Sequence, residues 1–180
     1  MKLSVCAIGG FALATIALGQ APERTVSASR QFIVYGVDTT LRGAISHLAE
    51  ETKANLLKLL HRSDAWETPV LVNLQFPQAN LPEIPPAALR FSQTGAGLKL
   101  QLELTVAADF DGAALERELL RAILLEMIYR QQPEIAPGTA YVEPPDWLLD
   151  GALAMMPGRD LQPFIDALEA ALVADKVTPL

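Results

Sequence analysis

The 180-residue sequence predicts a single α+β domain with a small, mostly antiparallel sheet, one long helix near the N-terminus and three helices near the C-terminus. Three observations support this prediction. Two runs rich in β-branched and aromatic residues enclose a long amphipathic stretch. A pair of strand-like segments with a glycine-containing turn between them comes next. Three stretches with helical spacing end the chain, whose length suits one domain with a substantial core.

Residues 1–19 have the features of a secretory signal peptide. Lys2 supplies a positive start, residues 5–18 are an apolar run, and Ala17-Leu18-Gly19 is a small-x-small cleavage pattern. The run is shorter than the roughly 20 residues that span a bilayer, so a membrane anchor is the weaker alternative. We therefore expect a secreted or periplasmic protein with no stable membrane span after cleavage.

Removal of the signal peptide would also remove Cys6, the single cysteine of the chain. A disulfide scaffold, a thiolate zinc site and a cysteine nucleophile would then be excluded. Of the 14 basic residues only Lys2 would be lost, which leaves 13 against 21 acidic residues and a net charge of −8. Because binding to nucleic acid depends on neutralising phosphates, we expect no nucleic-acid partner.

The N-terminal half contains two strand patterns and the longest helical pattern. A loose polar leader is expected over residues 20–29, and residues 30–36 form a β-branched and aromatic run typical of a strand. Asp38 is placed to cap a helix over residues 41–62, where leucine and isoleucine recur at helical spacing. Residues 69–76 are apolar almost throughout, which is typical of a central strand.

The C-terminal half begins with a predicted β-hairpin over residues 89–92 and 98–106. Leucine alternates with polar residues in its second arm, so one face should be buried and the other exposed to solvent. The next helix is expected over residues 116–130, capped by Asp109 or Asp111. Its centre is apolar on nearly all sides, which predicts that it runs through the core. Two shorter helical patterns complete the chain: residues 145–156 and residues 161–175.

Part of this half resembles the active site of gluzincin-type zinc peptidases, the peptidase MA-like group. Residues 145–154, Pro-Asp-Trp-Leu-Leu-Asp-Gly-Ala-Leu-Ala, resemble the Pro-x-Trp-Leu-x-Glu-Gly-x-Ala segment of that group, with one additional residue before the final alanine. Asp150 stands where the group has a glutamate that binds the metal. The preceding order of strand, long helix and valine-rich strand is also similar. The resemblance implies a zincin-like domain over residues 30–180.

The two histidines that bind zinc in such peptidases are both missing. Their His-Glu-x-x-His motif corresponds to residues 117–121, with Arg117 and Arg121 in the histidine positions and Glu118 in the glutamate position. A guanidinium group is always protonated and has no lone pair for a metal. In this alignment we expect Asp150 to lie against the core helix and to form a buried ion pair with Arg117 or Arg121.

A second alignment places the motif eight residues later. It assigns the histidine positions to Leu125 and Tyr129, with Glu126 in the glutamate position. Neither alignment provides the paired imidazoles of a zinc site. The chain's two histidines, His47 and His61, are fourteen residues apart and are not spaced to share one metal. We therefore expect no zinc and no other cofactor.

The resemblance also implies a role for the second helix. Trp147 and Gly151 are expected to anchor it against the core helix. With the metal motif lost, we expect a non-catalytic relative of these peptidases that binds or supports an unknown protein or envelope component. The alternative function is a metal-independent hydrolase in which Glu118 or Glu126 acts with Asp150 as an acid–base pair. A secreted α+β module with an accidental likeness is a third interpretation.

The signal-peptide assignment predicts the start of the exported protein. Cleavage after Gly19 should leave an N-terminus at or near Gln20, because this is where the small-x-small pattern ends. N-terminal sequencing of the protein recovered from the envelope or the medium checks this prediction. Cytoplasmic protein that keeps Met1 would contradict it.

Overall fold

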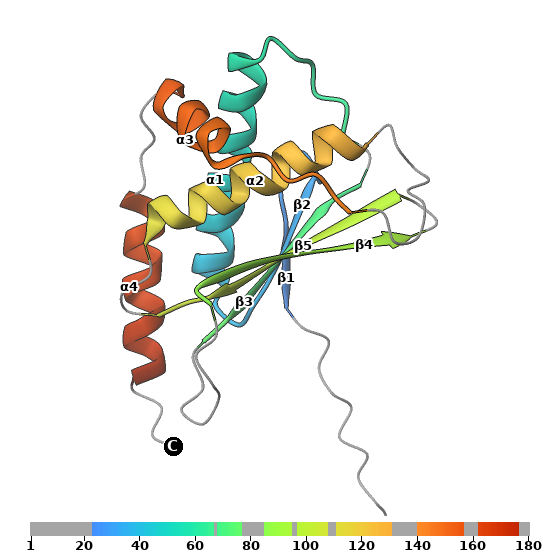
Figure 1. Cartoon of the computed structure of the whole chain (residues 1–180). Helices are drawn as coiled ribbons and strands as arrows, with labels where there is room; N and C mark the ends of the chain where they lie inside the picture. The colour runs from blue at the N-terminus through green and yellow to red at the C-terminus, as the bar shows by residue number, and fades with distance from the viewer. Residues whose placement is uncertain are drawn as a thin grey trace, which may run out of the picture.

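The computed structural model describes residues 23–66, 68–76, 85–94, 97–107, 111–130, 140–156 and 162–176. Within these ranges the chain forms one five-stranded mixed sheet and four helices (Figure 1). The α+β class and the three late helices are confirmed. The predicted signal peptide, residues 1–19, lies outside the described residues. None of the described helices is both long and apolar enough to cross a membrane.

The sheet combines parallel and antiparallel pairs. Its strand order is β1-β2-β3-β5-β4. The pairs β2–β3 and β3–β5 are parallel, while β1–β2 and β4–β5 are antiparallel. The prediction of a mostly antiparallel sheet is therefore wrong. A helix carries the chain from β2 back to the start of β3, and strands joined by such a crossover are parallel. The strands are β1 (Arg24–Val26), β2 (Phe32–Tyr35), β3 (Val70–Gln75), β4 (Ala87–Thr94) and β5 (Gly97–Thr105).

Strand β1 lies within the region predicted to be a loose leader. Its residues pair antiparallel with β2, from Arg24 opposite Tyr35 to Val26 opposite Ile33. The turn between the two strands contains Arg30 with a φ of 64°, a left-handed conformation that is uncommon for a residue with a side chain. The leader prediction is wrong for this part of the chain, because a three-residue edge strand is too short to show a period.

The helices begin close to their predicted positions. Asp38 caps α1 by accepting a hydrogen bond from Leu41 N at 2.7 Å, and Asp111 caps α2 by accepting one from Ala113 N at 2.9 Å. Both caps are among those predicted, and each satisfies a backbone donor that the first turn leaves free. The helices are α1 (Thr39–Leu59), α2 (Gly112–Tyr129), α3 (Asp146–Met155) and α4 (Gln162–Lys176).

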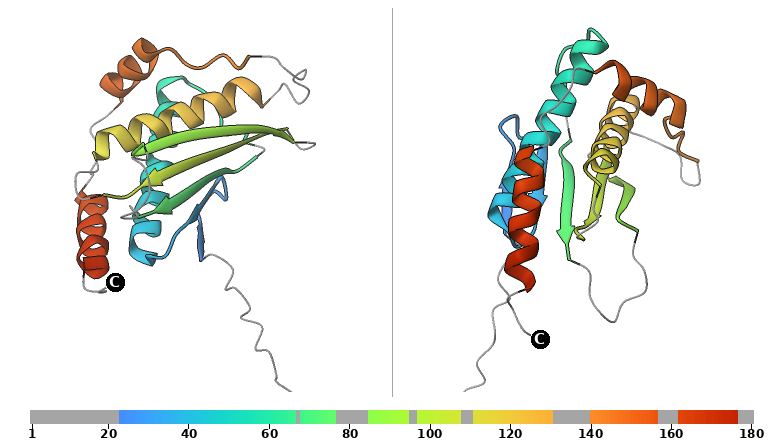
Figure 2. Two further views of the ribbon diagram at one scale, coloured as in Figure 1. Left: turned by 60° about the horizontal axis from the view of Figure 1, so that its bottom comes forward. Right: turned by 90° about the vertical axis from the view of Figure 1, so that its left-hand side faces the viewer.

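Helices α1 and α2 cover the sheet and carry the other two helices (Figure 2). Helix α1 packs on β1 and β2, and α2 packs on β4 and β5. Helix α3 lies on α2, on the side away from the sheet, and α4 lies beside α1. Alternate strand residues such as Val72, Leu100 and Leu102 are fully buried between the sheet and these helices. Helix α2 runs through the core as predicted, and all residues over 122–126 are buried.

A polar network joins α1 to the β1–β2 hairpin. Lys53, with only 4% of its side chain exposed, places Nζ 2.9 Å from a carboxylate oxygen of Glu50 and 3.1 Å from one of Asp64. Glu50 also accepts a hydrogen bond from Ser29 N at 3.0 Å and one from the Ser29 hydroxyl. The Lys53 ammonium lies 6.0 Å from the ring centroid of Phe32. The turn of the hairpin is thereby fixed to the middle of α1.

The network shifts the pKa of Glu50. Burial acts to raise this pKa, but hydrogen bonds from Ser27, Ser29 and Lys53 outweigh it and lower the pKa from 4.5 to about 2. A carboxyl group whose pKa is lower in the folded state stabilises the fold above its unfolded pKa. The contribution of Glu50 is therefore complete above about pH 5 and is lost as the pH falls towards 2.

Replacing Glu50→Gln should lower the free energy of unfolding at pH 7 by about 1 to 3 kcal/mol, because the charged acceptor of the network is removed. The difference from the unchanged protein should shrink as the pH is lowered from 5 towards 2. Urea unfolding at a series of pH values measures both effects. Glu51→Gln is the matched control, since Glu51 makes only a 3.7 Å contact with His47. Equal losses for the two variants would contradict the prediction.

Candidate functional site

The candidate site lies where α3 crosses α2. Leu119, Leu120 and Ile123 of α2 are fully buried, which turns Arg117 and Arg121 to the outer side of that helix. The inner side of α3 is apolar and rests on α2. It consists of three buried residues, Leu149, Ala152 and Met156.

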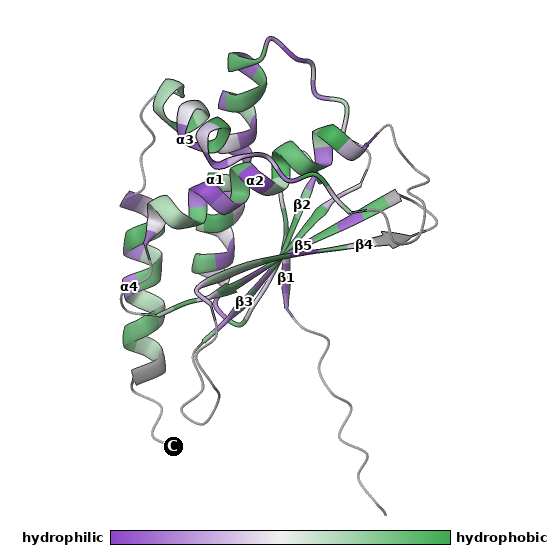
Figure 3. Ribbon diagram, in the orientation of Figure 1, coloured by the Kyte–Doolittle hydropathy of each residue, from purple (hydrophilic) through white to green (hydrophobic). Residues whose placement is uncertain are grey.

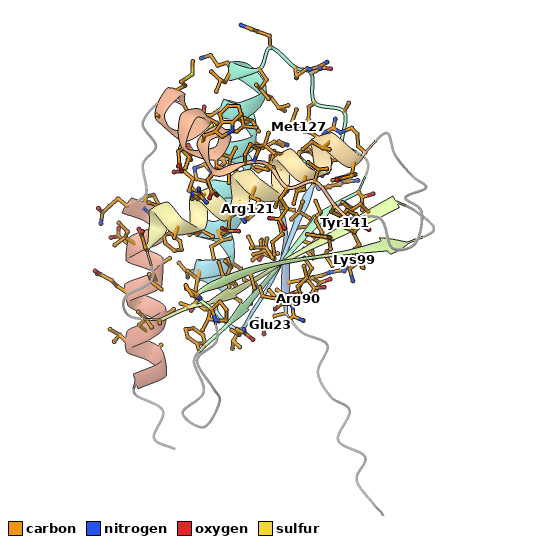
Figure 4. The ribbon with its side chains drawn as sticks, in the orientation of Figure 1. Glu23, Arg90, Lys99, Arg121, Met127 and Tyr141 are labelled. Carbon is orange, nitrogen blue, oxygen red and sulfur yellow. The ribbon has the colours of Figure 1, made fainter. Side chains whose placement is uncertain are left out.

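Aromatic contacts position the segment that leads into α3. The ring of Tyr141 lies 4.5 Å from that of Phe91 on β4 and 5.5 Å from that of Tyr129 on α2, between ring centroids. The Tyr129 hydroxyl accepts a hydrogen bond from Val142 N at 2.6 Å. Figure 4 labels Tyr141 on this segment and Arg121 on α2. The segment is thus held along α2 before α3 begins after Pro145.

Two arginines of α2 bond to carboxylates on and just before α3. Arg117 donates from Nε to Asp150 at 3.1 Å and from a terminal nitrogen to Asp146 at 3.0 Å. One turn later, Arg121 donates to Glu143 at 3.4 Å and lies 3.8 Å from Asp146. We call this group the α2–α3 ion cluster. Its members are Arg117, Glu118, Arg121, Glu143, Asp146 and Asp150.

The predicted pairing of Asp150 with Arg117 is present, but the expectation of a buried pair is wrong. The side chain of Asp150 is 65% exposed and that of Asp146 is 78% exposed, whereas Arg117 is 26% exposed. The reason is that α3 lies on the outside of α2, and Asp150 is at the edge of the α3 face that contacts it. A surface ion pair stabilises a protein by about 0 to 1 kcal/mol, well below the value for a buried pair.

Glu118 is the most shielded carboxylate of the ion cluster. Its side chain is 19% exposed and one oxygen lies 3.6 Å from Arg121. Burial raises the pKa of Glu118, and the positive charges of Arg121 and Arg117 offset this only in part. The pKa of Arg117 is also raised, because Asp146 and Asp150 accept hydrogen bonds from its charged form. Arg117 is therefore protonated at neutral pH.

The residues of the ion cluster do not fit a zinc ion. The positions that the resemblance assigns to histidine are occupied by Arg117 and Arg121, which donate hydrogen bonds to the neighbouring carboxylates. A guanidinium offers no lone pair and places a positive charge where a cation would bind. Among the described residues, no group of three or more histidine, cysteine or acidic side chains is arranged to hold a metal.

Trp147 and Gly151 are not anchors, contrary to the prediction. Trp147 is 73% exposed. A Cβ atom added at Gly151 would meet nothing within 4 Å, so no close packing requires glycine there. Leu149 and Ala152 anchor the helix instead. The start of the helix after Pro145 sets the direction of each side chain, and this phase turns Trp147 outwards.

The second alignment of the lost motif falls inside the core. Leu125 and Tyr129 are buried, and Glu126 accepts a hydrogen bond from Arg130 at 3.1 Å. Glu126 is nine residues after Arg117, about 13 Å further along the helix. The proposed acid–base pair of Glu126 with Asp150 is therefore not brought together, since Asp150 bonds to Arg117. Of the residues named in the two alignments, Arg117 is the one that bonds to Asp150.

Two members of the ion cluster were missed by the analysis of the sequence. Asp146 precedes Asp150 by one helical turn, so both project to the same side of α3. This spacing could have identified Asp146 as a site residue from the sequence. Glu143 lies before Pro144 and Pro145 in an irregular segment, where no period indicates its direction. Only the packing of that segment along α2 brings Glu143 to Arg121.

No protein-family model, curated protein or solved structure matches the chain. The likeness to zinc peptidases therefore rests on the sequence alone. It consists of the tryptophan-containing segment and the order of strand, long helix and valine-rich strand, whereas Arg-Glu-x-x-Arg departs from the metal motif.

A double-mutant cycle on Arg117→Ala and Asp150→Ala should give a coupling energy of about 0 to 1 kcal/mol, because water screens the pair. Added salt should reduce this coupling. Urea unfolding of the four proteins measures it. Leu149→Ala is the control from the buried side of α3 and should cost about 2 to 5 kcal/mol. A coupling of 3 kcal/mol or more would restore the interpretation of a buried bridge.

Proposed function

We propose that this chain is an exported, non-catalytic relative of the gluzincin-type metallopeptidases, and that it serves as a binding or structural domain in the bacterial cell envelope. One observation carries the proposal. Arg117, in the position of the first zinc-binding histidine, donates a hydrogen bond to Asp150, in the position of the third ligand. Residues that would converge on one metal in a peptidase thus converge here without a histidine at position 117 or 121 of α2.

The chemistry of the ion cluster supports a role without catalysis. In a zinc peptidase the motif glutamate takes a proton from water that the metal has activated. Glu118 has the corresponding position, but its neighbours are guanidinium groups, which supply hydrogen bonds and charge and do not bind water as a Lewis acid does. The arginines also hold Glu143, Asp146 and Asp150 in ion pairs.

A metal-independent hydrolase that uses Glu118 with Asp150 is the second candidate function. The raised pKa of Glu118 favours it, because a general acid must hold its proton near neutral pH. An acid–base pair also requires two carboxyl groups that are held next to the substrate in a cleft and are free of competing partners. Asp150 is instead largely exposed and bonded to Arg117, so the non-catalytic role is the better supported of the two.

The proposal predicts that the purified protein binds no zinc tightly and cleaves no casein. Equilibrium dialysis against zinc and a fluorescent-casein assay check these two expectations. Stoichiometric zinc, or proteolysis that a chelator abolishes, would contradict the proposal. Proteolysis that resists a chelator and disappears in Glu118→Gln would favour the hydrolase.

The alignment of Arg117 and Arg121 with the two zinc-binding histidines predicts a gain of function. A variant with Arg117→His, Arg121→His and Asp150→Glu should bind one zinc ion, because it restores two imidazoles one turn apart and the longer carboxylate opposite them. The matched control keeps Arg121 and carries only Arg117→His and Asp150→Glu, so it should bind zinc at least about tenfold more weakly. Equal affinities in the two variants would show that residues 117 and 121 do not correspond to the zinc ligands.

A further inference from the structure

Helix α3 presents an apolar face to solvent. Trp147 and Met155 are 73% and 71% exposed, and Gly151 and Ala154 between them are exposed as well. At about 100° per residue, these four positions lie on the side of the helix opposite the buried residues. We call this set the α3 outer face. Figure 3 shows residues coloured as hydrophobic along the ribbon of α3.

The α3 outer face has a large aromatic side chain at its N-terminal end and open space beside it. Tryptophan is among the side chains that contribute most to binding when it is buried in an interface. The space above Gly151 is open to at least 4 Å from a Cβ position. A side chain from another molecule can therefore lie against the Trp147 indole without any movement of α3.

Negative charge borders this face on one side. The ion cluster contains two arginines and four carboxylates, which gives a net charge of −2 with all groups ionised. The carboxylates of Glu143, Asp146 and Asp150 are each more than half exposed, whereas both arginines are mostly covered. An approaching molecule therefore meets an apolar surface with an acidic edge.

The negative charge of the ion cluster distinguishes between the molecules that could cover the α3 outer face. A second copy of the chain would bring the same acidic edge against this one, and like charges across an interface disfavour association. An anionic membrane surface would be repelled for the same reason. A polypeptide that carries lysine or arginine next to an apolar side chain complements both features. Alternate residues of an extended chain are about 7 Å apart, close to the rise of about 6 Å between Asp146 and Asp150.

We propose that the α3 outer face binds a basic segment of another polypeptide, with an apolar side chain against Trp147 and lysine or arginine side chains at Asp146 and Asp150. This inference rests on the proposed function, because it specifies the partner of the binding domain. Trp147 supplies apolar contact area, and the two aspartates supply charge and orientation. Each aspartate accepts its arginine bonds at Oδ1, and the described contacts leave Oδ2 available.

The test uses the full chain and a fluorescein-labelled nonapeptide of alternating lysine and leucine. Fluorescence anisotropy should show saturable binding that weakens with added salt. Trp147→Ser and the double variant Asp146→Asn with Asp150→Asn should each weaken binding at least about tenfold. Val173→Ser is the control, because Val173 is a largely exposed apolar residue on α4, and it should leave the affinity unchanged. Unchanged urea midpoints for Trp147→Ser and Val173→Ser show that both variants are folded.

A second peptide, with glutamate in place of every lysine, separates charge recognition from general stickiness. It should not bind. Equal binding of the two peptides, or full binding by Trp147→Ser, would overturn the inference. Sedimentation of the chain alone and binding to phosphatidylglycerol vesicles test the other occupants, and association that requires Trp147 in either experiment would also overturn it.

Mass spectrometry of the recovered peptide separates failure of this inference from failure of the proposed function. An intact peptide that does not bind overturns the inference alone. Cleavage of the peptide by the chain would overturn the proposed function and this inference with it.

Discussion

The burial of α2 on nearly all sides is the constraint on which the rest of the structure depends. Its leucines and Ile123 fill the space between the sheet, α1 and α3, where an unpaired charge would be costly. Apolar side chains make up most of its buried surface, and the buried carboxylate of Glu126 is paired with Arg130. Arg117, Glu118 and Arg121 project where α3 crosses, and they bring the ion cluster to the surface at that place. The position of the candidate site thus follows from the packing of one helix.

The features that were predictable from the sequence depend on neighbouring residues along the chain. The caps of α1 and α2 follow from an aspartate before an apolar period, and the passage of α2 through the core follows from its composition. The parallel pairing of β2, β3 and β5 depends on how the helical connection returns the chain, which a strand's own residues do not specify. The three residues of β1 form a strand only because β2 offers a free edge.

In the candidate site, too, some features were predictable from the sequence and others depend on packing. A resemblance of residue types identified Arg117 and Asp150, and the structure places these two side chains in contact. It did not identify the direction of Trp147, because a ten-residue helix with apolar residues on both sides has two possible inner faces. Leu149, Ala152 and Met156 decide between them by filling the surface of α2. The position of Glu143 beside Arg121 depends on the contact of Tyr141 with Tyr129, which fixes its segment along that helix.

The exposure of the ion cluster explains how one helix can have both a structural and a binding surface. A zinc ion would be bound directly by side chains of both helices, and α3 would then be held by its metal ligand. Arginine reaches its partners from a distance and leaves them solvated, so the ion pairs contribute little to holding α3 in place. Three apolar residues on its inner side do that instead. Because stability does not depend on the outer side, Trp147 and the acidic residues beside it are free to be selected for contact with another molecule.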